Sequence, residues 1–318
     1  MPASKSSLIT INNLEKSFID SLFSHALNLK KNFNQHEQKN PNSSGANDSG
    51  YKGTAALLFF EPSTRTRFSF EAAASRAGFH ALILDGGIGT SLEKGETIED
   101  TIYNIQSMRP SFFVIRCDAR VDLLKLDLEL AVPVINAGWG QQGHPTQALL
   151  DALTIFEKQG VLENKNILFI GDIKHSRVVS SHLELAEKLK YNIGYCAPEE
   201  FFPEVMQKDV QKFKKLNEAL EWADVVMALR VQKERHDNEN LFLLEDYREN
   251  FGLNHLSLKN LKSQALIMHP GPINYGVEIE SDVLHDKRCV ILKQVENGVF
   301  LREALIRKVT DYGLRTER

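Results

Sequence analysis

Residues 63–67 read Ser-Thr-Arg-Thr-Arg, three hydroxyl groups and two guanidinium groups in a row. The apolar run at 57–60 before them is typical of a buried strand, and the Ala-rich stretch at 66–77, which Gly78 ends, favours a helix. A helix N-terminus offers unpaired N–H groups to an anion, and the planar fork of an arginine matches phosphate oxygens. A capped, solvated turn is the ordinary alternative, but consecutive donor residues after a buried strand favour a phosphate site.

Polar side chains also follow other strand-like runs. Arg116 ends the run at 112–116, residues 171–177 (Gly-Asp-Ile-Lys-His-Ser-Arg) leave another strand, Arg230 opens an Arg-Val-Gln-Lys-Glu-Arg stretch, and residues 269–272 read His-Pro-Gly-Pro. Each of these alone could be a solvated strand end. In an open parallel sheet, however, ligands bind at the carboxyl ends of the strands, so the set indicates a site for small anionic molecules.

Residues 138–143, Gly-Trp-Gly-Gln-Gln-Gly, match the dinucleotide fingerprint in form and lie between a strand and a helix. His144 and Pro145 interrupt that junction, and no acidic residue closes a strand at the distance the fingerprint needs, so nucleotide binding is the weaker interpretation. Pro145 suits the first position of a helix, which leaves His144 near the helix start. There His144 could donate to a carbonyl oxygen while Gln147, one turn on, meets an amide.

The stretch at 86–97 is rich in Gly and Thr and carries Lys94. A flexible surface loop with a solvated lysine is the simple interpretation. A long glycine-rich connection in a compact domain is often functional, however, so both interpretations stay open on the residues alone.

Strand-like and helix-like segments alternate along the chain in two series, which predicts an α/β fold of two domains, each a parallel sheet covered by helices. We expect a first helix at 9–33, an exposed polar loop at 34–52, a linking helix from Pro145, and a closing helix at 298–312 that could pack on either domain. The expected strands are 57–60, 81–85, 112–116, 132–136, 167–171, 192–196, 224–229 and 265–268, and helices are expected at 66–77, 97–108 and 120–130.

The composition of the 318 residues, 42% apolar and 25% charged, is that of a globular protein with room for two cores. A net charge of −4 argues against general nucleic-acid binding. The three cysteines lie far apart without a C-x-x-C pair, which favours a reducing compartment and neither a disulfide framework nor a zinc site. No apolar stretch has the length of a membrane span and no signal-peptide core is visible, so we expect a cytoplasmic protein.

Five segments, in this order and spacing, resemble the catalytic chain of the aspartate carbamoyltransferase family over roughly residues 50–305: Ser-Thr-Arg-Thr-Arg, His-Pro-Thr-Gln, Gly-Asp-Ile-Lys-His-Ser-Arg, Arg-Val-Gln-Lys-Glu-Arg and His-Pro-Gly-Pro. The related ornithine enzymes normally read His-Cys-Leu-Pro at the last segment and lack the Arg-Val-Gln stretch. The resemblance implies transfer of a carbamoyl group from carbamoyl phosphate to the α-amine of L-aspartate, in pyrimidine biosynthesis, with no cofactor and no metal.

The resemblance also implies how the chain is organised. A carbamoyl-phosphate-binding domain is expected at 1–147 plus 299–318, and an aspartate-binding domain at 148–298. A homotrimer with active sites shared between neighbours is implied as well. A regulatory chain or a dihydroorotase is a further partner that the resemblance allows, whereas nucleic acid and membrane are not expected.

The same resemblance assigns residues to the two substrates. The implied phosphate ligands are Ser63, Thr64, Arg65, Thr66 and Arg116. Thr66, Arg116 and His144 would face the carbonyl oxygen, Gln147 the carbamoyl amide, and the backbone around Pro270 and Gly271 the carbamoyl and amine groups. The implied aspartate ligands are Arg177, Arg230 and Gln232. Ser91 and Lys94 would come from the adjacent subunit to carbamoyl phosphate, and Lys94 would contact aspartate as well. Those implied to take part in catalysis are Arg65, Thr66, Arg116, His144 and Gln147.

Two features depart from the family pattern. Tyr275 stands where many relatives carry an arginine after the His-Pro-Gly-Pro segment, which puts in doubt the network that links this loop to its surroundings. The polar insertion at 34–52 is expected to be silent. Two alternative functions remain: a carbamoyltransferase with another amine acceptor, and a catalytically silent subunit that serves as an assembly scaffold.

Overall fold

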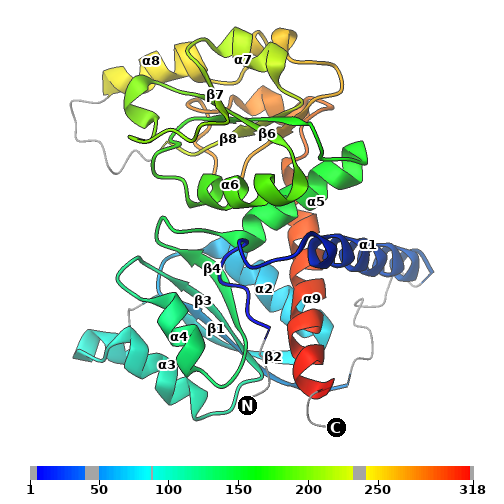
Figure 1. The fold of residues 1–318 in the computed structure, drawn as a ribbon, viewed down its shortest axis with the longest axis vertical. Coiled ribbons are helices and arrows are strands. Elements are labelled where there is room, and N and C mark those ends of the chain that lie inside the picture. The colour runs from blue at the N-terminus through cyan, green and yellow to red at the C-terminus, as the bar shows by residue number, and fades with distance from the viewer. Residues whose placement is uncertain (1–5, 40–49, 87–88, 232–240, 316–318) are drawn as a thin grey trace. The chain divides into compact units, whose positions relative to one another are not determined.

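The computed structural model describes residues 6–39, 50–86, 89–231 and 241–315 (Figure 1). The chain divides into two compact units: unit 1 comprises Met1–Leu150 and Val295–Arg318, and unit 2 comprises Asp151–Gln294. Each unit holds its own parallel sheet with helices packed on it, so the predicted α/β fold class is confirmed. The closing helix, for which the sequence left two positions open, belongs to unit 1 from Val295 onward.

Unit 1 contains a parallel sheet flanked by helices. Its strands are β1 (Gly53–Phe59), β2 (Phe79–Asp85), β3 (Phe112–Cys117) and β4 (Val134–Trp139), and its helices include α1 (Lys16–Lys39), α2 (Thr64–Ala77), α3 (Ile98–Gln106) and α4 (Leu123–Glu129). The strand order is β2-β1-β3-β4. Because side chains alternate along a strand, Ala56 and Leu58 of β1 join one buried cluster with Ile102 of α3 and Leu126 of α4, while α2 packs on the other face (Figure 1).

Unit 2 contains a second parallel sheet, in the order β7-β6-β5-β8-β9. Its strands are β5 (Asn166–Ile170), β6 (Asn192–Cys196), β7 (Val210–Phe213), β8 (Val225–Ala228) and β9 (Leu266–Met268), and its helices include α6 (Arg177–Leu189), α7 (Leu216–Trp222) and α8 (Leu241–Phe251). Helices α6 and α7 cover opposite faces of this sheet (Figure 1). The sequence analysis did not predict strand β7, because its Val-Gln-Lys-Phe segment is short and polar and lies at the edge of the sheet.

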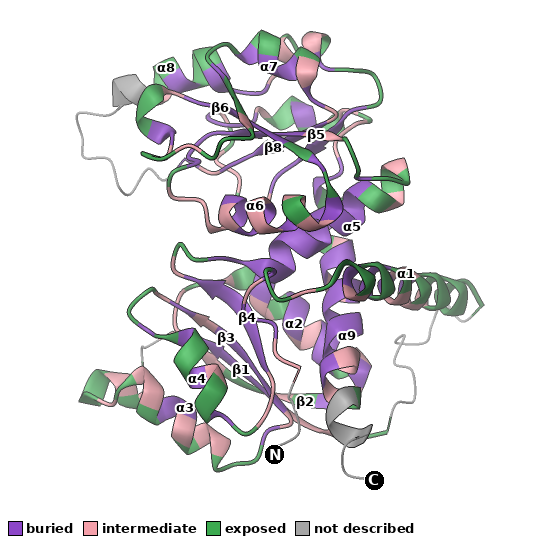
Figure 2. Ribbon diagram, viewed as in Figure 1, coloured by how far each residue is buried: buried purple, intermediate pink, exposed green. Residues whose placement is uncertain are grey.

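Two further helices continue from one unit into the other along the chain. They are α5 (Pro145–Gln159) and α9 (Ile291–Arg315). Residues 148–155 of α5 are buried without interruption, as the purple ribbon of Figure 2 shows, whereas Phe156 is 37% exposed. A helix that is buried all round needs apolar or internally satisfied side chains on every face, and Asp151 of α5 is one of the latter.

The N-terminal segment differs from the expected helix at 9–33. Helix α1 begins at Lys16, and Leu8 before it forms a bridge to the sheet: its N–H donates to Val134 O at 2.8 Å, and it pairs with Ile135 of β4. Leu8 and Ile9 are buried, so their apolar character reflects sheet-edge packing. The helix also runs to Lys39, so the first residues of the loop expected at 34–52 are helical; residues 40–49 lie outside the described part of the chain.

Helix α9 begins earlier than the sequence suggested, at Ile291, so Gly298 lies inside it and not before it. The presence of a glycine inside the helix is explained by close packing. A Cβ at Gly298 would lie 2.8 Å from Arg302 Nη1 and 3.1 Å from Leu150 Cδ2. This glycine therefore lets neighbouring side chains approach closely and does not mark a helix start.

We expect Gly78→Ala to lower the free energy of unfolding by about 1 kcal/mol, because Gly78 has a φ of 94° at the C-cap of α2, where a Cβ is disfavoured. Gly50→Ala is the matched control: no atom lies within 4 Å of a Cβ built there, so the change should stay within about 0.5 kcal/mol. Denaturant unfolding of both variants measures the difference, and equal losses at the two positions would contradict the prediction.

Candidate functional site

Three polar segments meet at the carboxyl edge of the unit 1 sheet. Residues 63–67 follow β1, Arg116 lies near the end of β3, and His144 follows β4. Phe59 of β1 is in register with Arg116, and the Phe60 N–H donates to Arg116 O at 2.9 Å. Since β1, β3 and β4 are neighbours in the sheet, their carboxyl ends present these segments at one edge.

The first turn of α2 is not capped by the Ser63 side chain. Ser63 is the N-cap residue, with φ −163° and ψ 90°, yet its hydroxyl makes no capping hydrogen bond. Thr64 and Arg65 are exposed, whereas Thr66 is buried. An N-cap hydroxyl such as that of Ser63 normally accepts a hydrogen bond from a backbone N–H of the first helical turn. Because this bond is not made, the hydroxyl and the N–H group are both able to contact a ligand.

The two arginines of the 63–67 segment have different surroundings. Arg67 forms an ion pair with Asp85 at the end of β2, and its guanidinium lies over the Phe68 ring. Arg65 makes no ion pair with any residue that the structure describes, and partial burial lowers the pKa of its guanidinium. The structure therefore leaves Arg65 as the uncompensated positive charge of this segment.

Arg116 is held by Glu61, an interaction that the sequence analysis did not single out. Arg116 Nε lies 3.4 Å from Glu61 Oε2, and the Arg116 side chain is 14% exposed. Glu61 directly follows the apolar run of β1, and an acidic residue at a strand end beside a basic cluster is the signal that could have indicated it. Its carboxylate lies beside the Nε edge of the guanidinium.

The loop at 138–143 closes on itself before α5 begins. The Trp139 N–H donates to Gly143 O at 3.0 Å, and a Cβ at Gly140 would lie 2.8 Å from Ala119 Cβ. The glycine spacing is thus explained by a tight turn. After it, His144 and Gln147 are 4% and 8% exposed, and the Gln147 N–H donates to His144 O at 3.0 Å.

Arg302 of α9 links the two helices that begin at this edge, and the sequence analysis missed it. Its Nη1 donates to Ser69 Oγ of α2 at 2.8 Å, and its Nη2 contacts Thr146 Oγ1 of α5 at 3.5 Å. Arg302 is 3% exposed, and its guanidinium lies over the Phe70 ring. A charged residue among the buried apolar residues of a helix was the available signal.

In unit 2, the candidate residues follow three adjacent strands. Arg177 begins α6 after β5, Arg230 follows β8, and Pro270 and Gly271 follow β9. The turn before Arg177 is fixed by Asp172, which is 3% exposed and accepts from His175 Nδ1 at 2.8 Å. Gln232, the remaining residue expected to hold aspartate, lies outside the described residues.

Ser91 and Lys94 lie in the short helix η1 (Ser91–Lys94), which Gly95 ends. Both side chains are exposed. Within the described part of the chain, neither makes a hydrogen bond to residues 63–66. One copy of the chain does not join these two residues to the 63–67 segment.

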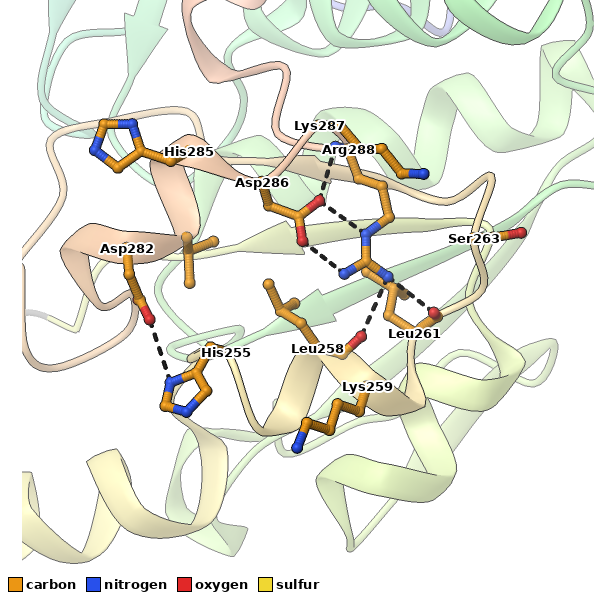
Figure 3. Close-up of a pocket in the computed structure, with 11 residues that line it drawn as sticks. His255, Leu258, Lys259, Leu261, Ser263, Asp282, His285, Asp286, Lys287 and Arg288 are labelled. Atoms are coloured by element: carbon orange, nitrogen blue, oxygen red, sulfur yellow. Dashed lines mark hydrogen bonds and ion pairs between the residues drawn. The ribbon is translucent and has the colours of Figure 1, made fainter.

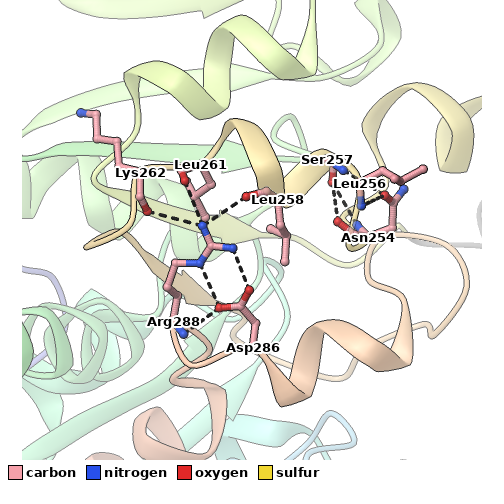
Figure 4. A network of polar contacts seen from close by, with 8 residues as sticks. All are labelled: Asn254, Leu256, Ser257, Leu258, Leu261, Lys262, Asp286 and Arg288. Carbon is pink, nitrogen blue, oxygen red and sulfur yellow. Dashed lines mark hydrogen bonds and ion pairs between the residues drawn. The ribbon is translucent and has the colours of Figure 1, made fainter.

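Unit 2 also has a surface hollow of about 780 Å³ that contains none of the expected site residues (Figure 3). Its charged groups are largely paired with one another. His255 Nδ1 lies 3.3 Å from Asp282 Oδ2, and Asp286 faces Arg288 with Nη2 to Oδ2 at 2.7 Å. The Arg288 Nη1 donates to Leu258 O and Leu261 O in the network of Figure 4. This arginine therefore ties loops together, and the hollow is not the candidate site.

The described residues contain no group of three or more His, Cys, Asp or Glu side chains that could hold a metal ion. Among those same residues, no helix has the length and apolar character needed to cross a membrane.

Two family models match the chain in succession. Residues 6–157 match the carbamoyl-P binding domain of aspartate/ornithine carbamoyltransferase, and residues 163–309 match the Asp/Orn binding domain of the same family. The chain belongs to the aspartate/ornithine carbamoyltransferase family. The resemblance drawn from the five sequence segments is thereby confirmed.

Individual relatives narrow the comparison within this carbamoyltransferase family. The chain is 38% identical over 307 residues to the aspartate carbamoyltransferase catalytic subunit of Halothermothrix orenii, with 96% of each chain covered. It is 39% identical to the corresponding subunit of Opitutus terrae, covering 96% of this chain and 95% of that one.

Solved structures agree with this placement. The catalytic subunit of M. jannaschii aspartate transcarbamoylase has a TM-score of 0.82 at 27% identity, with 96% of this chain and 98% of that chain covered. Aspartate transcarbamoylase from Trypanosoma cruzi, in complex with carbamoyl aspartate and phosphate, has a TM-score of 0.80 at 27% identity, with 96% and 95% covered.

The Asp286–Arg288 pair predicts a pH-dependent stability. Hydrogen bonds from Arg288 lower the pKa of Asp286, so its contribution is complete above the ordinary aspartate pKa of about 3.9 and is lost as the pH falls through the lowered value. We expect Asp286→Asn to lose about 1–3 kcal/mol of unfolding free energy at neutral pH, and the loss to shrink below about pH 4. Asp209→Asn, at an exposed position, is the control; a loss that does not change with pH would contradict the prediction.

Proposed function

We propose that this chain transfers the carbamoyl group of carbamoyl phosphate to the α-amine of L-aspartate, giving N-carbamoyl-L-aspartate and phosphate for pyrimidine biosynthesis. The observation that carries the proposal is Arg65, a partly desolvated cation at the start of α2 that no carboxylate compensates among the described residues. A dianionic phosphate would supply the missing negative charge there. The T. cruzi relative in complex with carbamoyl aspartate and phosphate supports the same reaction.

In the proposed site, Ser63, Thr64, Arg65, Thr66 and Arg116 hold the phosphate group of the substrate. Buried Thr66 and His144, together with Arg116, face the carbonyl oxygen, and Gln147 meets the carbamoyl amide. Donors in a buried, water-poor position are stronger than in solution, so this arrangement suits an oxygen that gains negative charge during the reaction.

Aspartate brings two carboxylates, for which unit 2 offers Arg177 and Arg230 at the ends of adjacent strands. Gln232 is the third proposed ligand. The backbone at Pro270 and Gly271 lines the carbamoyl and amine groups. Together with Lys94, the four proposed arginine ligands supply five positive charges for the four negative charges of a phosphate dianion and a dicarboxylate.

The proposed reaction is a direct displacement. The neutral α-amine attacks the carbonyl carbon, a C–N bond forms, and the oxyanion of the tetrahedral intermediate is stabilised by Thr66, Arg116 and His144. The C–O bond to phosphate then breaks, and the departing phosphate takes the proton from the amine. Positioning and charge stabilisation supply most of the rate enhancement, since the expected site offers no carboxylate suited to act as a general base.

We further propose a cytoplasmic homotrimer in which Ser91 and Lys94 complete the site of a neighbouring copy. Their exposure in η1 and the lack of a bond to residues 63–66 in the described chain support this placement. A regulatory chain or a dihydroorotase is a further proposed partner.

The substrate panel is the first test. With carbamoyl phosphate present, L-aspartate should give carbamoylaspartate and phosphate, and L-ornithine should give no product above background. Product identification by mass spectrometry reads out both arms. Turnover with ornithine instead would favour the alternative amine acceptor, and no turnover with either would favour a silent scaffold.

Mixing two inactive variants tests the shared site. We expect Arg65→Ala and Lys94→Ala each to lower kcat by about a hundredfold or more, because each removes a cation from the transferring group. In a trimer reassembled from equal amounts, about one site in four would combine an intact Arg65 with a neighbour's intact Lys94, so about a quarter of wild-type activity should return.

Two controls accompany this mixture. Lys125→Ala, at an exposed lysine of α4, should keep full activity. The mass of each variant in solution should equal that of the wild type. Mixed trimers without recovered activity would reject the shared site and leave the proposed reaction itself untouched.

A further inference from the structure

Gln294 joins two parts of unit 2 through both ends of its side-chain amide. It is 2% exposed; its Nε2 donates to Asp151 Oδ1 at 2.8 Å, and its Oε1 accepts from the His269 N–H at 2.9 Å. A carboxylate can only accept and a backbone N–H can only donate, so the orientation of this amide is fixed by its partners.

The Asp151 side of this contact is anchored in the buried interior. Asp151 is fully buried, and its Oδ2 lies 3.3 Å from Nε2 of His182, which is fully buried as well. His182 Nδ1 is 2.9 Å from Tyr191 Oη, and the His182 ring packs edge-on against Phe169 of β5. A polar network without water contact holds its members firmly only when every member is satisfied.

The His269 side is the loop that follows β9. His269 Nδ1 accepts from the Gly271 N–H at 2.7 Å, so the ring carries its proton on Nε2, which lies 3.4 Å from Glu278 Oε1. The same carboxylate oxygen accepts from the Asn274 N–H at 2.6 Å. Both ends of residues 269–274 are therefore bound to buried side chains.

The loop is also tied to the segment after β8. Asn274 Nδ2 donates to Val231 O at 2.9 Å, and Val231 is the neighbour of Arg230 in the chain. Tyr275, the next residue after Asn274, is 56% exposed. The contacts just described hold the loop through His269, Asn274 and Glu278, and none of them uses position 275.

We propose that Gln294 is a positioning residue for the proposed reaction, on which this inference rests: it sets the backbone of Pro270 and Gly271 by holding His269 against the Asp151–His182 pair. Gln294 touches neither substrate. It acts through the hydrogen bond to the His269 N–H, and its amide is needed because one end must donate and the other accept.

A reversal of the hydrogen bond between Gln294 and Asp151 tests the proposal. Gln294→Leu removes both hydrogen bonds of the side-chain amide, and the double variant Gln294→Glu with Asp151→Asn rebuilds them. The double variant restores the bond with opposite polarity, because the new amide at position 151 donates and the new carboxylate at position 294 accepts. The amide oxygen at position 151 remains available to His182. Gln207→Glu, at an exposed position of unit 2, is the matched control.

We expect Gln294→Leu to lower kcat about tenfold. Binding of inorganic phosphate, measured by calorimetry, should change less than about twofold, because the phosphate ligands lie in unit 1. Amide hydrogen exchange across 265–280 should quicken in Gln294→Leu. The double variant should regain kcat to within about threefold of wild type and regain slow exchange.

A double variant no more active than Gln294→Leu, or one that does not fold, would overturn the proposal, since it restores the hydrogen bond. Gln294→Leu with wild-type kcat and wild-type exchange would overturn it as well. If the wild-type chain does not carbamoylate aspartate, the proposed function fails, while hydrogen exchange across 265–280 still decides whether Gln294 positions the loop.

Discussion

The distribution of carboxylates at the edge of the first sheet determines what that edge can bind. Three arginines lie there, and two of them have a nearby acid: Arg67 pairs with Asp85, and Arg116 contacts Glu61. Arg65 has no such partner among the described residues and is partly removed from water. A positive charge without a carboxylate beside it favours a bound anion, so the proposed binding of phosphate and the local electrostatics are two aspects of one constraint.

In unit 2, the corresponding constraint is the conformation of a short loop of prolines and glycine that follows the sheet. Proline lacks a backbone donor, so the Pro-Gly-Pro part of 270–272 can form few ladder hydrogen bonds of its own. Buried side chains take their place: His269 accepts from Gly271, Glu278 accepts from Asn274, and Gln294 accepts from His269. The loop gains order from polar groups that lie outside it in the sequence.

The sequence predicted what depends on local patterns. Continuous apolar runs identified the strands of both sheets, and the sheet-edge rule brought residues 63–67, Arg116 and His144 to one edge, although the roles given to them stay predictions. It missed what depends on distant partners. Strand β7 has a polar sequence and exists because β6 pairs with it. Arg302 and Gln294 contact residues far away in the chain, and no periodicity reveals such contacts.

Gly298 connects such a distant contact to the proposed phosphate site. Its hydrogen leaves room for the Arg302 guanidinium, which reaches Ser69 one turn beyond Thr66 in α2. Any side chain at 298 would compete with that guanidinium for the same volume. A methyl group added at position 298 would displace the Arg302 guanidinium, and through Ser69 it would disturb the start of α2. The effect on phosphate binding could then resemble the removal of one of the proposed phosphate ligands, although position 298 lies more than two hundred residues after them in the chain. The role of Gly298 is accordingly steric, since the residue has no chemistry of its own.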